Sequence, residues 1–160
     1  MTEKEVSYKI LRFDKLLSFL KDISRNVYKT NNITFQYFES DLVPHFYARL
    51  ENIVDLDTKS EKKLLTFKYG FKTVGGVNIR KEKTTPISDP KFYIELFKFL
   101  GLKRKGSKHK LQYRFNIAKV DITVNKWKEM SPRIEVEANS VKNIKSFVNQ
   151  IKDFVELENK

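Results

Sequence analysis

The chain has 160 residues, and its 40% hydrophobic and 13% aromatic content is typical of one globular domain. It has no cysteine, which excludes disulfides, thiolate metal sites and cysteine nucleophiles, and its two histidines are too few for a multi-histidine metal centre. The formal charge of +12 favours polyanionic partners such as nucleotides, polyphosphate or nucleic acid. No apolar run is long enough to span a membrane and the N-terminus is charged, so we expect a soluble, cytoplasmic protein. We expect residues 1–160 to form a single domain, as a monomer or a homodimer.

The first half of the chain changes between the period of a strand and that of a helix. Residues 4–13 alternate as a strand, and apolar residues at helical spacing then predict a helix over 14–26. Aromatic and β-branched residues predict further strands, with a charged turn over 55–63 and a hairpin turn at Gly75-Gly76. These strands are 33–39, 45–54, 64–71 and 77–84.

The second half continues with a helix over 90–100, which Gly101 ends, and a strongly basic run over 103–110 that is expected to be partly turn. Three more strands and a final helix with an apolar stripe from Val141 to Val155 follow. These strands are 108–117, 119–127 and 133–137. About eight strands with three main helices indicate a single α+β unit.

Charged side chains share one face of most of these strands. In 133–137, Ile134 and Val136 lie on one face, while Glu135 and Glu137 lie on the other. For a single strand, this pattern is typical of an ordinary solvated face. The same face carries, in other segments, mostly cations: Glu5, Lys9, Arg49, Lys68, Arg80, Glu82, Lys108 and Lys110. This shared face is either a solvated outer face or the inside of a closed antiparallel β-barrel, a tunnel whose charged interior holds one small ligand and whose apolar outer face is covered by helices. The barrel is the prediction that the structure tests.

The order and spacing of these motifs resemble those of the CYTH superfamily of triphosphate tunnel metalloenzymes, over nearly the whole chain. This superfamily includes class IV adenylyl cyclases, thiamine triphosphatases and inorganic tripolyphosphatases. The motifs are an E-x-E-x-K-like strand (Glu5 to Lys9), T-x-K (Thr66, Lys68), R-x-E (Arg80, Glu82), a K-x-R-x-x-Y pattern (Lys108, Lys110, Tyr113), and Trp127 followed by the closing Glu135 and Glu137.

Four positions depart from the family pattern. Ser7 stands where the family has its second N-terminal glutamate, and Asn125 stands where an aspartate usually precedes the Trp. Phe35 occupies a commonly acidic position, and Tyr47 replaces the first arginine of an R-x-R pair. The first two departures remove negative charge from the metal-binding side, so the resemblance implies one metal ion more readily than two. Ser7, Glu82 and Asn125 are expected to face the tunnel.

The resemblance implies a role for each charged residue. Six cations would bind the triphosphate: Lys9, Arg49, Lys68, Arg80, Lys108 and Lys110. Glu5, Glu135 and Glu137 would hold Mg²⁺ or Mn²⁺, and no catalytic residue is separable from these two sets. The implied substrate is ATP, thiamine triphosphate or tripolyphosphate, and the implied activity is that of a triphosphatase or an adenylyl cyclase. Two alternatives stay open: a non-catalytic nucleotide or polyphosphate binder, and a basic nucleic-acid-binding module that uses 103–110.

Overall fold

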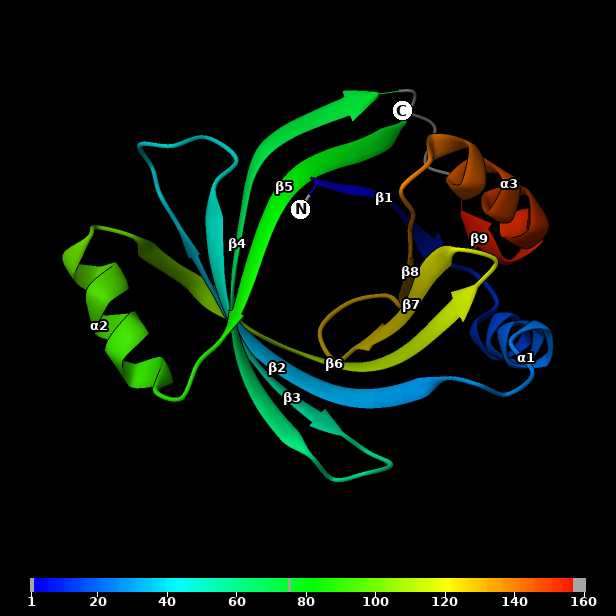
Figure 1. Ribbon diagram of the computed structural model, residues 1–160, viewed down its shortest axis with the longest axis horizontal. Coiled ribbons are helices and arrows are strands. Elements are labelled where there is room, and N and C mark those ends of the chain that lie inside the picture. Colours follow the sequence, from blue (N-terminus) through cyan, green and yellow to red (C-terminus); the bar gives the residue numbers. More distant parts are fainter. Residues whose placement is uncertain (1, 75, 157–160) are drawn as a thin grey trace.

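Antiparallel strands close into a β-barrel, and three helices pack on its outside (Figure 1). The structure, a computed structural model, describes residues 2–74 and 76–156, so Gly75 of the predicted hairpin turn and the ends of the predicted 1–160 domain lie outside the described residues. The strands are β1 (Thr2–Ile10), β2 (Lys29–Glu39), β3 (Tyr47–Asp55), β4 (Glu61–Val74), β5 (Val77–Pro86), β6 (Lys103–Ile117), β7 (Val120–Trp127), β8 (Arg133–Glu137) and β9 (Val155–Glu156). The helices are α1 (Phe13–Ile23), α2 (Pro90–Phe99), α3 (Val141–Ile151) and a 3₁₀ turn, η1 (Lys152–Phe154).

The barrel closes where its first strand meets the middle of the chain. The strand order is β5-β4-β3-β2-β6-β7-β8-β1-β9, and β1 also pairs with β5, which joins the two ends of the eight-stranded wall. In this register Glu5 lies opposite Asn78 of β5 on one side and opposite Glu137 of β8 on the other. The short strand β9 adds to β1 beyond the closure. The predicted closed antiparallel barrel is therefore confirmed.

The apolar cores lie outside the barrel, between its outer face and the helices. The larger core packs α1 and α3 against the outer faces of β1, β6, β7 and β8, with Leu16, Ile122, Val136 and Ile144 almost fully buried. The smaller core packs Phe97 of α2 against β2, β3 and β4. Figure 1 shows α2 on one side of the barrel and α1 with α3 on the opposite side. Because the strands bury their apolar side chains outward, their polar side chains are left to line the interior.

Two of the helices, α2 and α3, form for reasons that the sequence carries. Helix α2 begins at Pro90, and the Asp89 carboxylate caps it by accepting hydrogen bonds from the backbone N–H groups of Lys91 and Phe92. Helix α3 places Ile144, Phe147 and Ile151 on one buried face. None of the helices in the described part of the chain has both the length and the apolar character needed to cross a bilayer.

The basic run over 103–110 is strand rather than partly turn, so that expectation was wrong. Strand β6 begins at Lys103, and a bulge opposite Tyr37 and Phe38 takes up the irregular register around Gly106, whose φ of 142° favours glycine. Two of its cations already have acidic partners, because Lys103 pairs with Asp41 and Lys105 Nζ lies 3.8 Å from Glu39. These pairs reduce the positive charge that this run offers to a nucleic acid.

Candidate functional site in the barrel interior

A cavity of about 550 Å³ runs through the barrel interior and is lined by every strand from β1 to β8. Its charged lining is balanced between carboxylates and cations. The carboxylates are Glu5, Glu51, Glu82, Asp121, Glu135 and Glu137, and the cations are Arg49, Lys62, Lys68, Arg80, Lys110 and Arg114. The positive excess of the whole chain therefore lies outside the lining of this cavity. The interior is highly charged but formally neutral.

One side of the cavity, which we call the paired wall, consists of Arg49 and Glu51 on β3, Thr66 and Lys68 on β4, and Glu82 and Thr84 on β5. Lys68 Nζ lies 2.8 Å from Glu82 Oε2, and Arg49 Nε lies 2.9 Å from Glu51 Oε1 as an ion pair without hydrogen-bond alignment. Thr66 donates to Glu51 at 3.2 Å, and Thr84 donates to Glu82 at 2.9 Å.

The two threonine hydroxyls of the paired wall lie 3.0 Å apart, which brings its two ion pairs side by side. Each hydroxyl has a single hydrogen, so it donates either to its carboxylate or to the other hydroxyl. Burial acts to raise the pKa of Glu82, but Lys68 and the Thr84 hydroxyl outweigh it and lower the pKa overall. Glu82 therefore stays ionised, and each carboxylate of this wall has a partner within the wall.

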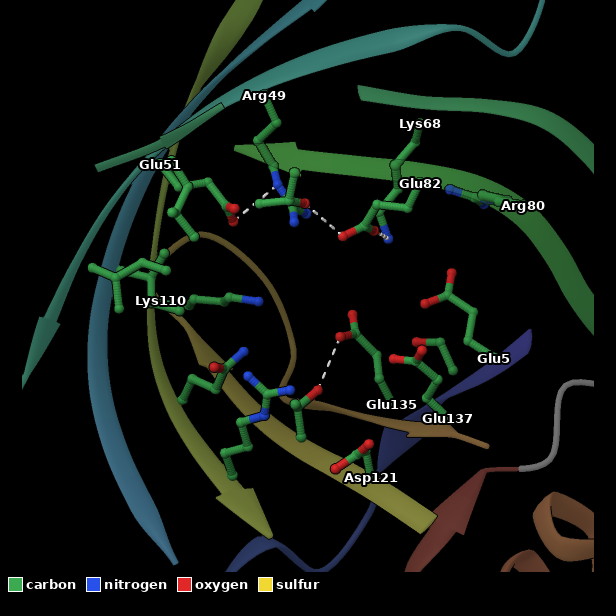
Figure 2. A pocket seen from close by; sticks show the side chains of 18 of the residues that line it. Glu5, Arg49, Glu51, Lys68, Arg80, Glu82, Lys110, Asp121, Glu135 and Glu137 are labelled. Carbon is green, nitrogen blue, oxygen red and sulfur yellow. Dashed lines mark hydrogen bonds and ion pairs between the residues drawn. The ribbon is translucent and has the colours of Figure 1, made fainter. Parts of the chain in front are cut away.

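The opposite side, which we call the acidic wall, consists of Glu5 on β1, Asp121 on β7, and Glu135 and Glu137 on β8. Antiparallel register puts Glu137 directly opposite Glu5 on one neighbouring strand and Asp121 on the other. Figure 2 shows these carboxylates facing Arg49, Lys68 and Glu82 across the cavity. Neither Glu5 nor Glu137 makes a hydrogen bond or an ion pair with another described residue. Three carboxylates thus form one row across adjacent strands.

The two glutamates of β8 differ in their electrostatic surroundings. Burial raises the pKa of Glu137, and although Lys68 opposes this, the negative charges of Asp121, Glu5 and Glu82 add to the rise. Burial also acts to raise the pKa of Glu135, but Lys110 and the Thr123 hydroxyl, which donates to it at 3.0 Å, lower the pKa overall. Glu137 is therefore the glutamate of β8 whose ionised form lacks a sufficient counter-charge.

Aromatic rings support the cations at the side of the cavity formed by β2, β6 and β7. Phe35 packs edge-on against both Tyr37 and Trp127, with ring centroids 4.8 and 5.5 Å apart. The Lys110 ammonium lies 5.0 Å from the Trp127 ring and 5.8 Å from that of Phe35. Burial lowers the pKa of Lys110 and Glu135 opposes this, and the net shift is downward. Burial raises the pKa of Tyr37 to about 12, so this phenol stays protonated.

Most of the residues predicted from the sequence line the cavity together. These are Glu5, Ser7, Arg49, Lys68, Arg80, Glu82, Lys110, Glu135 and Glu137. Three predicted residues do not line it. Lys9 is half exposed and pairs with Glu156 of β9 at 2.9 Å, and Lys108 lies against the rings of Tyr37 and Trp127. Asn125 is fully buried and accepts a hydrogen bond from Gln112.

Sequence reasoning gave no role to four charged residues that line the cavity: Glu51, Lys62, Arg114 and Asp121. Glu51 follows Arg49 by two positions and Arg114 follows Lys110 by four, so both share the alternation of a selected residue. Lys62 lies in a segment predicted to be turn, but β4 already begins at Glu61. Applying the two-residue alternation along the full length of every strand would have identified all four as residues that face the interior.

The side chain of Ser7, where the CYTH resemblance implies a second glutamate, has a partner of its own. Arg133 Nε donates to Ser7 Oγ at 3.0 Å, and Arg133 Nη2 donates to the Ser7 backbone carbonyl at 3.3 Å. The family position for a carboxylate thus holds a hydroxyl that is bonded to a cation. This exchange reduces the negative charge of the acidic wall at Ser7.

The acidic wall fits a divalent ion that is shared with a substrate, and does not fit a cage of protein ligands. Among the side chains of residues 4–74 and 76–156, no three carboxylates or imidazoles lie close enough together to hold one ion. Mg²⁺ commonly takes only one or two protein carboxylates and completes its shell with water and phosphate oxygens. Glu5 and Glu137, which lie opposite each other on neighbouring strands, offer such a pair.

The comparisons with known proteins show the fold. No protein-family model matches the chain, and no curated protein sequence matches it. The PH1012 protein from Pyrococcus horikoshii is 20% identical, with a TM-score of 0.77 over 96% of this chain and 94% of that one. A Hippeastrum protein assigned as an adenylyl cyclase, with a dominant triphosphatase activity, is 13% identical, with a TM-score of 0.67 over 94% and 87%.

The same fold occurs in a chain of a larger assembly. A chain of the Schizosaccharomyces pombe Mediator head module is 8% identical, with a TM-score of 0.70 over 98% of this chain and 97% of that one. At these identities the likeness concerns the fold alone. The chain therefore has the barrel that adenylyl cyclase-like and triphosphatase proteins share, as the CYTH resemblance implies.

Proposed function

We propose that the barrel interior binds a triphosphate-bearing substrate together with Mg²⁺ or Mn²⁺ and catalyses phosphoryl chemistry on it. The observation that carries this proposal is one cavity that holds ion-paired Arg49 and Lys68 on one side and, on the other, Glu5 and Glu137, which make no ion pair with another described residue, with Lys110 reaching in between (Figure 2). The fold shared with the Hippeastrum protein, which has triphosphatase activity, supports the proposal.

Arg49, Lys68, Arg80 and Lys110 are the side chains that would bind the phosphate oxygens. Arginine can contact phosphate with two parallel N–H groups, whereas lysine acts as a point charge. The buried Nε of Arg80 has no hydrogen-bond partner among the described residues, so this donor gains an acceptor when phosphate binds, whereas Nε of Arg49 already lies 2.9 Å from Glu51 Oε1. The aromatic rings and the paired wall hold these cations in position before the substrate binds. Positioning of the reacting groups supplies much of the catalysis in phosphoryl transfer.

Glu5 and Glu137 would hold the divalent ion from the acidic wall, and Glu135 lies two positions earlier on the same strand. When bound, such an ion neutralises phosphate charge and polarises the phosphorus that reacts. Charge balance supports its presence, because the lining is formally neutral and several buried phosphate charges need compensation. The protein residues orient the triphosphate, while water or a substrate hydroxyl would serve as the nucleophile in hydrolysis or cyclisation.

The test is incubation with Mn²⁺ and either ATP or tripolyphosphate, followed by chromatographic separation of phosphate, pyrophosphate and cyclic nucleotide. Lys110→Gln should lose substrate binding, whereas Lys9→Gln, a matched change outside the cavity, should retain it. Equal loss in both variants, or normal turnover in Lys110→Gln, would contradict the proposed site.

A non-catalytic triphosphate binder is the second candidate. The contact of Arg133 with Ser7 favours it, because a cation lies where the family has a metal-binding carboxylate. This candidate predicts saturable binding of ATP or tripolyphosphate without any product over prolonged incubation with Mn²⁺. Release of phosphate or pyrophosphate that depends on Glu137 would exclude it.

A further inference from the structure

A second cavity of about 330 Å³ opens beside the barrel interior and shares two of its lining residues, Tyr47 and Arg80. Its other lining residues come from the loop between β2 and β3, its flanking positions and β4: Glu39, Ser40, Val43, His45, Phe46 and Phe71. The volume lies at the lower end of the range of about 300–1,000 Å³ for small-molecule sites. Tyr47 and Arg80 thus lie at the boundary of the two cavities, where a ligand in either one can contact them.

Arg80 is held at the junction of the two cavities. Its guanidinium lies over the Phe71 ring, with Cζ 4.9 Å from the ring centroid, and Nη1 donates to the Tyr47 hydroxyl at 3.3 Å. Its Nε is buried and has no hydrogen-bond partner among the side chains that the structure describes. These contacts fix the plane of the guanidinium while leaving a donor for an anionic group at the junction.

The second cavity has an aromatic and apolar character that a bare polyphosphate does not use. The ring of His45 lies 5.5 Å from that of Phe71, and Phe46 and Val43 add apolar surface. Polyphosphate alone has no apolar face to bury here. A planar heteroaromatic ring can stack on such side chains, and the Glu39 carboxylate can accept a hydrogen bond from an amino group on its edge.

We infer that the second cavity holds the heteroaromatic ring of the substrate, so that the ligand is a nucleoside triphosphate rather than inorganic tripolyphosphate. The inference rests on the proposed function, since it assigns the ring of the same substrate whose phosphates occupy the barrel interior. Arg80 then contacts the ligand where its organic part meets its phosphates. Thiamine triphosphate has a ring as well, and the experiment separates it from a nucleotide.

The experiment measures the affinity of the full chain, with Mg²⁺, for the β,γ-imido analogue of ATP, for thiamine triphosphate and for tripolyphosphate. In the unmodified protein, the nucleotide should bind more tightly than the other two ligands. His45→Ala should weaken nucleotide binding by about tenfold, as expected for loss of one stacking partner, and leave tripolyphosphate within about twofold. His109→Ala is the matched control, because this second histidine lies on β6 and lines neither cavity.

The outcomes separate this inference from the proposed function. If tripolyphosphate binds as tightly as the nucleotide and His45→Ala changes neither, the ring site is wrong while the triphosphate site stands. Tighter binding of thiamine triphosphate than of the nucleotide would overturn the nucleotide assignment. If no ligand binds, the proposed function itself fails. Phe71→Leu, which keeps an apolar side chain beneath Arg80, provides a second variant that should weaken nucleotide binding selectively.

Discussion

The paired wall and the acidic wall both bring carboxylates into one cavity, but the two walls differ in how the negative charge of these carboxylates is compensated. Glu51 and Glu82 have cations and threonine hydroxyls beside them, and the pKa of Glu82 is lowered. Glu5 and Glu137 face each other across neighbouring strands, and the pKa of Glu137 is raised. A buried charge that has an ion-pair partner in the protein is compensated without a ligand. A buried charge that has no such partner is compensated when a ligand supplies the opposite charge. This difference assigns a structural role to the carboxylates Glu51 and Glu82, whereas Glu5 and Glu137 are the carboxylates that would hold the proposed divalent ion.

The sharpest test of this division is removal of the charge that faces the proposed metal ion. Glu137→Gln should reduce metal-dependent turnover by about 100-fold or more, because an electrostatic ligand of the reacting site is lost. The free energy of unfolding should not fall, since the change removes repulsion with Glu5 and Asp121. Steady-state kinetics and urea denaturation measure the two effects. Glu156→Gln, on the outer surface beside Lys9, is the control.

Removal of a carboxylate from the paired wall should instead lower the free energy of unfolding. Glu51→Ala removes the partner of the largely buried Arg49 and should lower the free energy of unfolding by about 3 kcal/mol. Glu5→Ala, on the acidic wall, should stay within about 0.5 kcal/mol of the unmodified protein. Urea denaturation of both variants gives the comparison. A larger loss for Glu5→Ala would reverse the roles assigned to the two walls.

The dependence of stability on pH should also distinguish Glu137 from Glu82 and Glu135. Because the pKa of Glu137 is raised in the folded state, that state holds more protons than the unfolded chain above the ordinary glutamate pKa. Stability from this residue should therefore fall as pH rises through the window between the ordinary and the raised pKa. The lowered pKa values of Glu82 and Glu135 have the opposite effect, with stability lost as pH falls below the ordinary value. Thermal denaturation of Glu137→Gln across this pH range should lack the first component.

The smallest effect is expected at Ser7, where the CYTH resemblance implies a second glutamate. Ser7→Glu would place a carboxylate beside Arg133, which would pair with it, so Mn²⁺ affinity should change by less than about threefold. Combining Ser7→Glu with Arg133→Met should raise Mn²⁺ affinity further, because the competing cation is removed. Titration calorimetry compares the variants. A full gain from Ser7→Glu alone would show that Arg133 does not compete.

Alternation along single strands predicted much of the fold and the site. Lys68, Arg80 and Glu135 could be assigned to the interior because side chains of a strand alternate between its faces, and the motif order indicated a closed barrel. Lys9 follows the same alternation as Glu5, but it pairs with Glu156 of a two-residue strand that has no clear sequence pattern. The ion pairs could not be predicted, because the register that puts Lys68 opposite Glu82 joins separate strands.

The way β1 closes the barrel has a consequence for how the chain folds. This strand is made first, yet its contacts reach far along the chain; Ser7 and Arg133, for example, are 126 residues apart. Long-range pairings of this kind slow folding, because a large loop must close before they form. Until β5 and β8 are available, β1 has open edges that can pair with another chain. We expect slow refolding, with exchange of β1 between molecules as the characteristic error at high protein concentration.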